Sequence, residues 1–159
     1  MGEIEEMNKV LSEWAQEVID RIKYNLDFTG TTASGKTKDS LRYEVETDEF
    51  GGKLTIFGRQ YFQGVEEGRP AGRIPYKFQD ILYTWAESKG ILSKFGDTES
   101  KQRSALYMVG QFIKAHGTRL WNDGGRTDIY SETFDMELPK LRDKIAYQIK
   151  QTIHDYIAE

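Results

Sequence analysis

The residues from Gly30 to Thr37 match the pattern of a phosphate-binding loop. They read Gly-Thr-Thr-Ala-Ser-Gly-Lys-Thr, which satisfies G-x-x-x-x-G-K-[ST] in full. In such a site backbone N–H groups and a helix N-terminus hold the phosphates, Lys36 reaches the outer phosphates and Thr37 holds magnesium.

That chemistry requires a strand before the loop and a helix after it. Here a helical pattern precedes the loop, a strand pattern follows it, and no apolar strand ends in an Asp that would complete the magnesium site. We therefore interpret residues 28–38, which are rich in Thr, Gly and Ser, as a mobile loop. A small nucleotide-binding protein that uses Lys36 and Thr37 is the least favoured functional alternative.

Cationic and aromatic side chains occur close together between Arg59 and Lys77, the second candidate region. This mixture is typical of hot spots in protein–protein interfaces and also of grooves that bind single-stranded nucleic acid. A solvated loop with weak surface ion pairs is the third interpretation. The set therefore keeps a nucleic-acid-binding module open as an alternative. Its basic members are Arg59, Arg69, Arg73 and Lys77, and its aromatic members are Tyr61, Phe62 and Tyr76.

The remaining polar residues do not form a catalytic or metal-binding pattern. His116 and His154 lack His, Asp or Glu partners at ligand spacing. The acidic pairs Glu5-Glu6 and Glu66-Glu67 are adjacent, so on a helix their side chains point apart. No G-x-S-x-G nucleophile pattern occurs. We expect no catalytic residue, no cofactor and no metal site, and hence no enzyme.

Composition indicates one globular domain over residues 1–159. The chain has 38% hydrophobic and 30% charged residues, and a formal charge of −4 that argues against a dedicated nucleic-acid binder. It has no cysteine, so disulfides and thiolate metal sites are excluded. No apolar run approaches the roughly 20 residues of a membrane span, and the acidic start predicts no secretory signal.

Helical periodicity predicts four helices, at about 3–26, 75–89, 98–116 and 134–157. In the first helix an apolar seam recurs at steps of three and four, which favours a helix that faces the core, with Trp14 buried. The side chains of Asp97 and Thr98 are expected to cap the third helix. In the last helix Pro139 is expected within the first two turns or at a kink. Its expected core face consists of Leu141, Ile145, Ile149, Ile153 and Tyr156.

The second helix should begin at Pro75, because a first turn does not need the N–H that proline lacks. Gly90 should close it in the left-handed conformation, with Ile91 packing back on the last turn. We expect Trp85 to be in the core and Trp121, in a glycine-rich turn, not to be fully buried. The expected buried face comprises Phe78, Ile81, Leu82, Trp85 and Ala86.

Alternating residues predict a β-hairpin at about 40–58. Leu41, Tyr43 and Val45 alternate with polar neighbours, and a turn at residues 48–53 should join them to a strand containing Leu54 and Ile56. Because two strands alone are marginal, we expect a third strand at 127–133. The predicted fold class is α+β, a small antiparallel sheet packed by four helices with the terminal helices adjacent.

The segment from Tyr61 to Ile91 carries a resemblance to a known family. It contains Tyr-x-x-x-x-Glu-x-Gly-Arg-x-x-Gly-x-x-Pro, then a helix with Trp85 and a Lys-Gly-Ile end. With the Thr29–Lys36 run and the Gly117–Leu120 and Gly124–Tyr130 segments, this resembles the neck and minor tail components of tailed bacteriophages. The carried-over positions are Tyr61, Glu67, Gly68, Arg69, Gly72, Pro75, Trp85 and Gly90, to which the resemblance gives no catalytic role.

The resemblance implies a structural virion protein. Such a chain is a subunit of a ring in the head–tail connector or tail, joins head to tail and lines the DNA exit path. The expected partners are further copies of the chain and neighbouring connector and tail proteins. DNA is expected to pass through the channel without sequence-specific binding to the chain, and no membrane is expected to be bound. It would assemble in the host cytoplasm and reside in the virion. The long Asp123–Thr133 loop departs from the commoner pattern and leaves its ring neighbours open. The predicted subunit-interface residues are Tyr61, Glu67, Arg69, Pro70, Arg73, Trp121 and Arg126.

Overall fold

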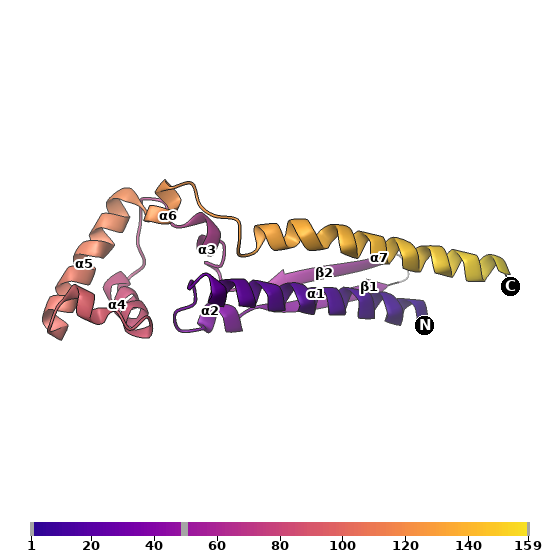
Figure 1. Cartoon of the computed structure of the whole chain (residues 1–159), viewed down its shortest axis with the longest axis horizontal. Helices are drawn as coiled ribbons and strands as arrows, with labels where there is room; N and C mark the ends of the chain where they lie inside the picture. Colours follow the sequence, from indigo (N-terminus) through magenta and orange to yellow (C-terminus); the bar gives the residue numbers. More distant parts are fainter. Residues whose placement is uncertain (1, 49–50, 159) are drawn as a thin grey trace. The chain divides into compact units, whose positions relative to one another are not determined.

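The computed structural model describes residues 2–48 and 51–158, and its fold is α+β, as predicted. Contacts divide the chain into two compact units, drawn in Figure 1. Unit 1 comprises residues 1–29, 40–59 and 127–159, and unit 2 comprises residues 30–39 and 60–126. The single domain over 1–159 stays a prediction. No helix in the described part of the chain is long and apolar enough to cross a membrane.

Helix α1 (Gly2–Phe28) supplies most of the core of unit 1, and the hairpin and α7 both pack against it. The predicted apolar seam is confirmed from Leu11 onward, and Leu26 extends it by one turn. Ile4, at the start of the seam, is exposed instead. The buried α1 residues are Leu11, Trp14, Ala15, Val18, Ile19, Ile22 and Leu26.

The hairpin predicted at 40–58 is confirmed. Strand β1 (Arg42–Asp48) pairs antiparallel with β2 (Gly51–Phe57), in a register that runs from Arg42 opposite Phe57 to Asp48 opposite Gly51. Tyr43 and Val45 are half-buried while their neighbours are exposed, as alternation predicts. In the predicted 48–53 turn, residues 49 and 50 lie outside the described residues, and the Gly51 N–H donates to Asp48 Oδ1 over 3.0 Å.

The third strand expected at 127–133 is wrong. Within residues 2–48 and 51–158 the sheet has two strands, and residues 128–130 form a turn that leads into helix α7 (Ser131–Ala158). The reason is local hydrogen bonding. The Glu132 N–H donates to the Thr127 carbonyl over 3.0 Å, and Asn25 of α1 donates through Nδ2 to the Ile129 carbonyl over 2.9 Å. The side chain of Ile129 is therefore buried beside α1 as part of a turn and not as part of a strand.

Helix α7 packs against α1 and runs antiparallel to it (Figure 1), so the terminal helices are adjacent, as predicted, and the first turns of α1 lie at the same end of unit 1 as the last turns of α7. Gln148 Nε2 donates to Glu6 Oε1 over 3.1 Å near these ends. Pro139 lies inside the helix, beyond its second turn. Leu141 is buried and Ile145 half-buried, as expected. The core positions predicted farther along the helix are wrong, because the first turns of α1, which meet α7 at the Gln148–Glu6 bond, leave Ile149, Ile153 and Tyr156 exposed.

Unit 2 is helical in its described residues, and α4, η1 and α5 pack against one another. Its core contains Ala86 of α4 and Leu106 and Gly110 of α5. Thr98 caps α5 as predicted, accepting a hydrogen bond from the Lys101 N–H at Oγ1. The elements are α2 (Lys36–Asp39), α3 (Gly64–Glu67), α4 (Phe78–Ser88), η1 (Leu92–Phe95), α5 (Glu99–His116) and α6 (Arg119–Asn122).

Helix α4 begins at Phe78 rather than at Pro75, so the predicted first-turn proline is wrong. Lys77 before it adopts a left-handed conformation with φ of 55°, which separates Pro75 from the helix. Of the predicted buried face, Ala86 is buried and Phe78 and Leu82 are half-buried beside Gly110 of α5. The prediction is wrong for Ile81 and Trp85, which are 51% and 42% exposed, because they lie to the side of the strip that α5 covers. The predicted end is confirmed: Gly90 has φ of 67°, and Gly90 and Ile91 donate to the carbonyls of Glu87 and Ala86.

One arginine joins α4 to α5 on the surface of unit 2. Arg103 donates from Nε to Glu99 Oε1 over 2.8 Å and from Nη1 to Asp80 Oδ1 over 2.9 Å. Its guanidinium also lies 4.4 Å from the centre of the Tyr83 ring. The hydrogen bond to Glu99, followed by the one to Asp80, raises the pKa of Arg103. Arg103 therefore stays charged and connects three side chains of two helices.

Candidate interaction surface

The Gly68–Pro75 loop of unit 2 is held in place by main-chain hydrogen bonds. The Arg69 N–H donates to Thr118 Oγ1 over 2.9 Å, and the Thr118 N–H returns a bond to the Arg69 carbonyl over 2.8 Å. Farther along, the Gly72 N–H donates to the Lys114 carbonyl over 2.8 Å. These bonds use carbonyl and hydroxyl groups at the end of α5 and the start of α6. These bonds therefore hold the backbone of the loop in one shape against α5 and α6.

Gly68 explains why the loop can approach α6 so closely. It has φ of 76°, and a Cβ atom built on it would lie 2.5 Å from the Trp121 nitrogen and 2.7 Å from Thr118 Oγ1. Both the left-handed backbone and the lack of space require glycine here. The neighbouring chain is tied in as well, since the Arg126 N–H donates to the Glu66 carbonyl over 2.8 Å.

The two arginines of this loop have different environments. Arg69 is half-buried, its Nη2 donates to the Arg73 carbonyl over 2.6 Å, and its guanidinium lies 5.5 Å from the Phe78 ring centre. Its Nε is shielded from solvent and has no hydrogen-bond partner among the described residues. Arg73, by contrast, is exposed. Arg69 therefore stabilises the loop, and Arg73 is the arginine that points to solvent.

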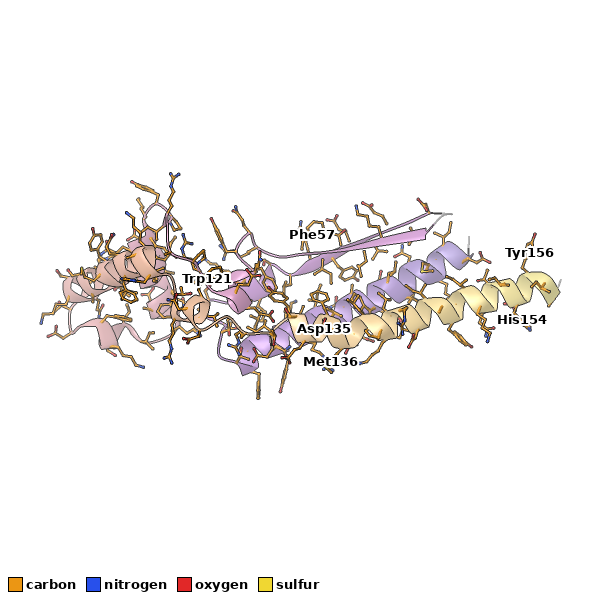
Figure 2. The ribbon with its side chains drawn as sticks, turned by 90° about the horizontal axis from the view of Figure 1, so that it is seen from above. Phe57, Trp121, Asp135, Met136, His154 and Tyr156 are labelled. Carbon is orange, nitrogen blue, oxygen red and sulfur yellow. The ribbon has the colours of Figure 1, made fainter. Side chains whose placement is uncertain are left out.

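All seven predicted interface residues belong to unit 2. The main chain ties their segments together: Arg69 bonds to Thr118, Gly68 lies against the main chain of Trp121, and Arg126 bonds to the Glu66 carbonyl. Trp121 is 45% exposed, in agreement with the prediction that it is not fully buried, and Figure 2 labels it. Glu67 accepts a hydrogen bond from Gln63 Nε2 over 2.6 Å. Five of the seven are exposed, namely Tyr61, Glu67, Pro70, Arg73 and Trp121, whereas Arg69 and Arg126 are half-buried.

The basic set weighed for nucleic-acid binding is divided between the two units. Arg59 belongs to unit 1, whereas Arg69, Arg73 and Lys77 belong to unit 2. Lys77 lies 5.7 Å from the centre of the Tyr76 ring. Because Arg69 is engaged inside its own loop, the exposed cations of this segment in unit 2 are Arg73 and Lys77. Arg69 keeps its charge, because its partner is a neutral carbonyl, so three of the four cations belong to unit 2 and two of these are exposed.

The Gly30–Thr37 loop lies in a different context from a phosphate-binding loop. It follows α1, and the single-turn helix α2 separates it from β1. The Gly30 carbonyl accepts a hydrogen bond from Lys89 Nζ. The required order of strand, loop and long helix is therefore not met. In the described ranges, no group of three or more His, Asp or Glu residues is placed to hold a metal ion.

Sequence reasoning missed the exposed apolar side chains of two helices. On α5, Tyr107, Met108 and Phe112 are exposed, and the centre of the Phe112 ring lies 4.6 Å from that of the His116 ring. On α7, Ile149, Ile153 and Tyr156 are exposed, and Figure 2 shows Tyr156 extending from the ribbon near its end. The signal was present, because both helices carry more apolar positions than one core-facing stripe needs.

Comparisons of this chain with protein-family models, with curated proteins and with solved structures find no match.

Proposed function

We propose that this chain is a structural subunit of a ring in the neck or tail of a tailed bacteriophage. In this proposal it joins head to tail, surrounds the path of the DNA and acts by assembly rather than by catalysis. The phage assignment rests on the resemblance of the Tyr61–Ile91 segment. The host cytoplasm is the proposed place of assembly, and the virion is the final location.

The observation that carries the proposal is the exposure of large apolar side chains on two long helices. Met108 and Phe112 of α5 are 65% and 61% exposed, and Tyr156 of α7 is 83% exposed. Scattered apolar residues are normal on a surface, but clustered Met and aromatic residues are typical of protein interfaces. The fixed Gly68–Pro75 loop supports the same conclusion, since a preformed loop loses little conformational entropy on docking.

The test combines particle assembly with a matched pair of variants. A phage whose copy of this gene is inactivated should yield full heads and separate tails under the electron microscope, and the wild-type chain supplied in trans should restore joined particles. Arg73→Ala should restore fewer joined particles than Arg59→Ala, which changes an arginine outside the predicted interface. Normal infectious particles in the absence of the chain would refute the proposed function.

A further inference from the structure

Charge is distributed unequally between the two units. Unit 1 holds 18 acidic and 10 basic residues, whereas unit 2 holds 8 acidic and 12 basic residues. The formal charges are therefore −8 and +4, which together give the −4 of the whole chain. A chain divided in this way attracts other copies of itself when unlike units meet and repels them when two units 1 meet.

The exposed apolar residues of α5 lie in the basic unit. From Lys101 to Asn122 the sequence has no acidic residue. Lys114 is exposed on the same helix as Tyr107, Met108 and Phe112. Lys101 is exposed as well, and its Nζ pairs with Asp97 Oδ1 over 2.8 Å. We call these three apolar residues, with Lys101 and Lys114, the α5 surface, and Lys114 is its unpaired cation among the described residues. An apolar centre with a cationic rim is the composition expected of one half of an interface.

The exposed apolar residues of α7 lie in an acidic setting. The bond from Gln148 to Glu6 places the first turns of α1 beside the C-terminal half of α7. Those first turns carry Glu3, Glu5 and Glu6, all exposed. We call these three glutamates, with Ile149, Ile153 and Tyr156, the end surface. It combines an apolar centre with a rim in which three glutamates outnumber one exposed cation of α7, Lys150, so the rim is anionic in balance.

We infer that the α5 surface of one copy binds the end surface of a second copy, head to tail. The inference rests on the proposed function, because it names the contact by which the ring subunits associate. Pairing of two end surfaces would bring two sets of glutamates together, whereas the α5 surface brings lysines to them. Two different surfaces on one chain make a heterologous interface, which repeats from copy to copy and closes into a ring when the rotation permits.

The experiment uses two variants of the full chain, each altered at one surface. Met108→Glu with Lys114→Glu alters the α5 surface, and Glu5→Lys with Ile153→Glu alters the end surface. All four positions are exposed, so circular dichroism should show both variants folded as the wild type. Light scattering during size-exclusion chromatography measures the mass of each variant alone and of their equimolar mixture.

The wild type should form oligomers whose mass rises with concentration. Each variant alone should be a monomer, because each lacks one of the two surfaces that an interface needs. Their mixture should form a heterodimer and nothing larger, since one intact α5 surface and one intact end surface remain. Lys101→Glu with Lys114→Glu should raise the dissociation constant by about tenfold or more, and adding Glu3→Lys with Glu5→Lys should reverse most of that loss.

Three results would overturn the inference. The first is a wild-type chain that stays monomeric. The second is self-association of the α5-surface variant, because it would indicate that two end surfaces pair. The third is a mixture that contains no heterodimer. None of these results concerns the joining of heads to tails, so the proposed function is tested separately by the particle assay. The opposite combination is also distinguishable. If the chain forms head-to-tail oligomers, but phage that lack the chain still join heads to tails normally, the contact is correct and the proposed function is wrong.

Discussion

Trp14 of α1 donates its indole N–H to the main-chain carbonyl of Glu137 in α7 over 2.9 Å. The ring is buried and lies 6.5 Å from the Phe134 ring, centre to centre. One side chain therefore fills the space between the two longest helices and also fixes their register. Trp14 belongs to unit 1, which contains none of the predicted interface residues, so its replacement tests the fold alone.

Replacing Trp14 should destabilise unit 1 more than replacing any exposed tryptophan destabilises the chain. Trp14→Ala should cost about 3–5 kcal/mol of unfolding free energy, because it leaves a cavity. Trp14→Phe keeps much of the volume but loses the hydrogen bond to Glu137, which should lower the unfolding free energy by about 1 kcal/mol. Urea denaturation followed by circular dichroism measures both, with Trp121→Ala as the exposed control. An equal loss in the control would contradict the assignment of the core.

Gly68→Ala should distort the loop that approaches α6. The added methyl group would collide with the main chain at Trp121, and the left-handed backbone adds strain. We expect a loss of roughly 2–4 kcal/mol, the sum of overpacking and backbone terms. Gly30→Ala is the matched control, since Gly30 has φ of 66° with nothing within 4 Å. If the two variants have the same melting temperature, the close approach at Gly68 does not matter for stability.

Arg69 and Arg73 should differ in what their removal affects. Arg69→Ala deletes a hydrogen bond within the loop and should cost about 1 kcal/mol, with faster hydrogen exchange at the Gly72 amide. Arg73→Ala should leave exchange in the loop unchanged, because its side chain is exposed. Exchange monitored by mass spectrometry separates the two roles. Equal protection in both variants would show that Arg69 does not hold the loop.

The Gly30–Thr37 loop should bind no nucleotide. ATP or GTP with magnesium should leave the melting temperature unchanged, whereas a ligand at 100 times its dissociation constant would add about 2.7 kcal/mol. Lys36→Ala is the control, and it should behave as the wild type does. A saturable rise in melting temperature that disappears in Lys36→Ala would restore the phosphate-binding interpretation.

Asp97 should make the start of α5 sensitive to acid. The hydrogen bond from Lys101 lowers the pKa of Asp97 from its ordinary value of 3.8, with backbone hydrogen bonds adding to the effect. A carboxyl whose pKa is lower in the folded state stabilises above the unfolded value and loses that contribution as the pH falls through the folded value. The melting-temperature difference between wild type and Asp97→Asn should therefore be constant near neutrality and vanish well below pH 3.8. A difference independent of pH would exclude this ion pair as its cause.

Periodicity located the long helices because a helix places apolar side chains at steps of three and four on one face, whereas a strand would scatter them over both faces. The same pattern could not reveal what covers each stripe. Ile149 and Ile153 have the spacing of core residues, yet α1 leaves them exposed, and an apolar stripe looks the same whether its own chain or a partner covers it. The predicted strand at Ile129 failed because one buried isoleucine between Thr and Tyr also fits a turn fixed by Asn25. The engagement of Arg69 depends on Arg73 and Phe78 together, a three-dimensional contact without a sequence signature.

The two strands of the hairpin have open edges in the isolated chain. In the described part of the molecule β1 and β2 pair only with each other, so each has an outer edge that can template a further strand. Strand β1 is protected by Arg42, Glu44, Glu46 and Asp48, whereas β2 ends in Leu-Thr-Ile-Phe and carries Lys53 as its single charge. Heating or overexpression should therefore start fibril formation at β2, and replacing Lys53 with an apolar residue should accelerate it.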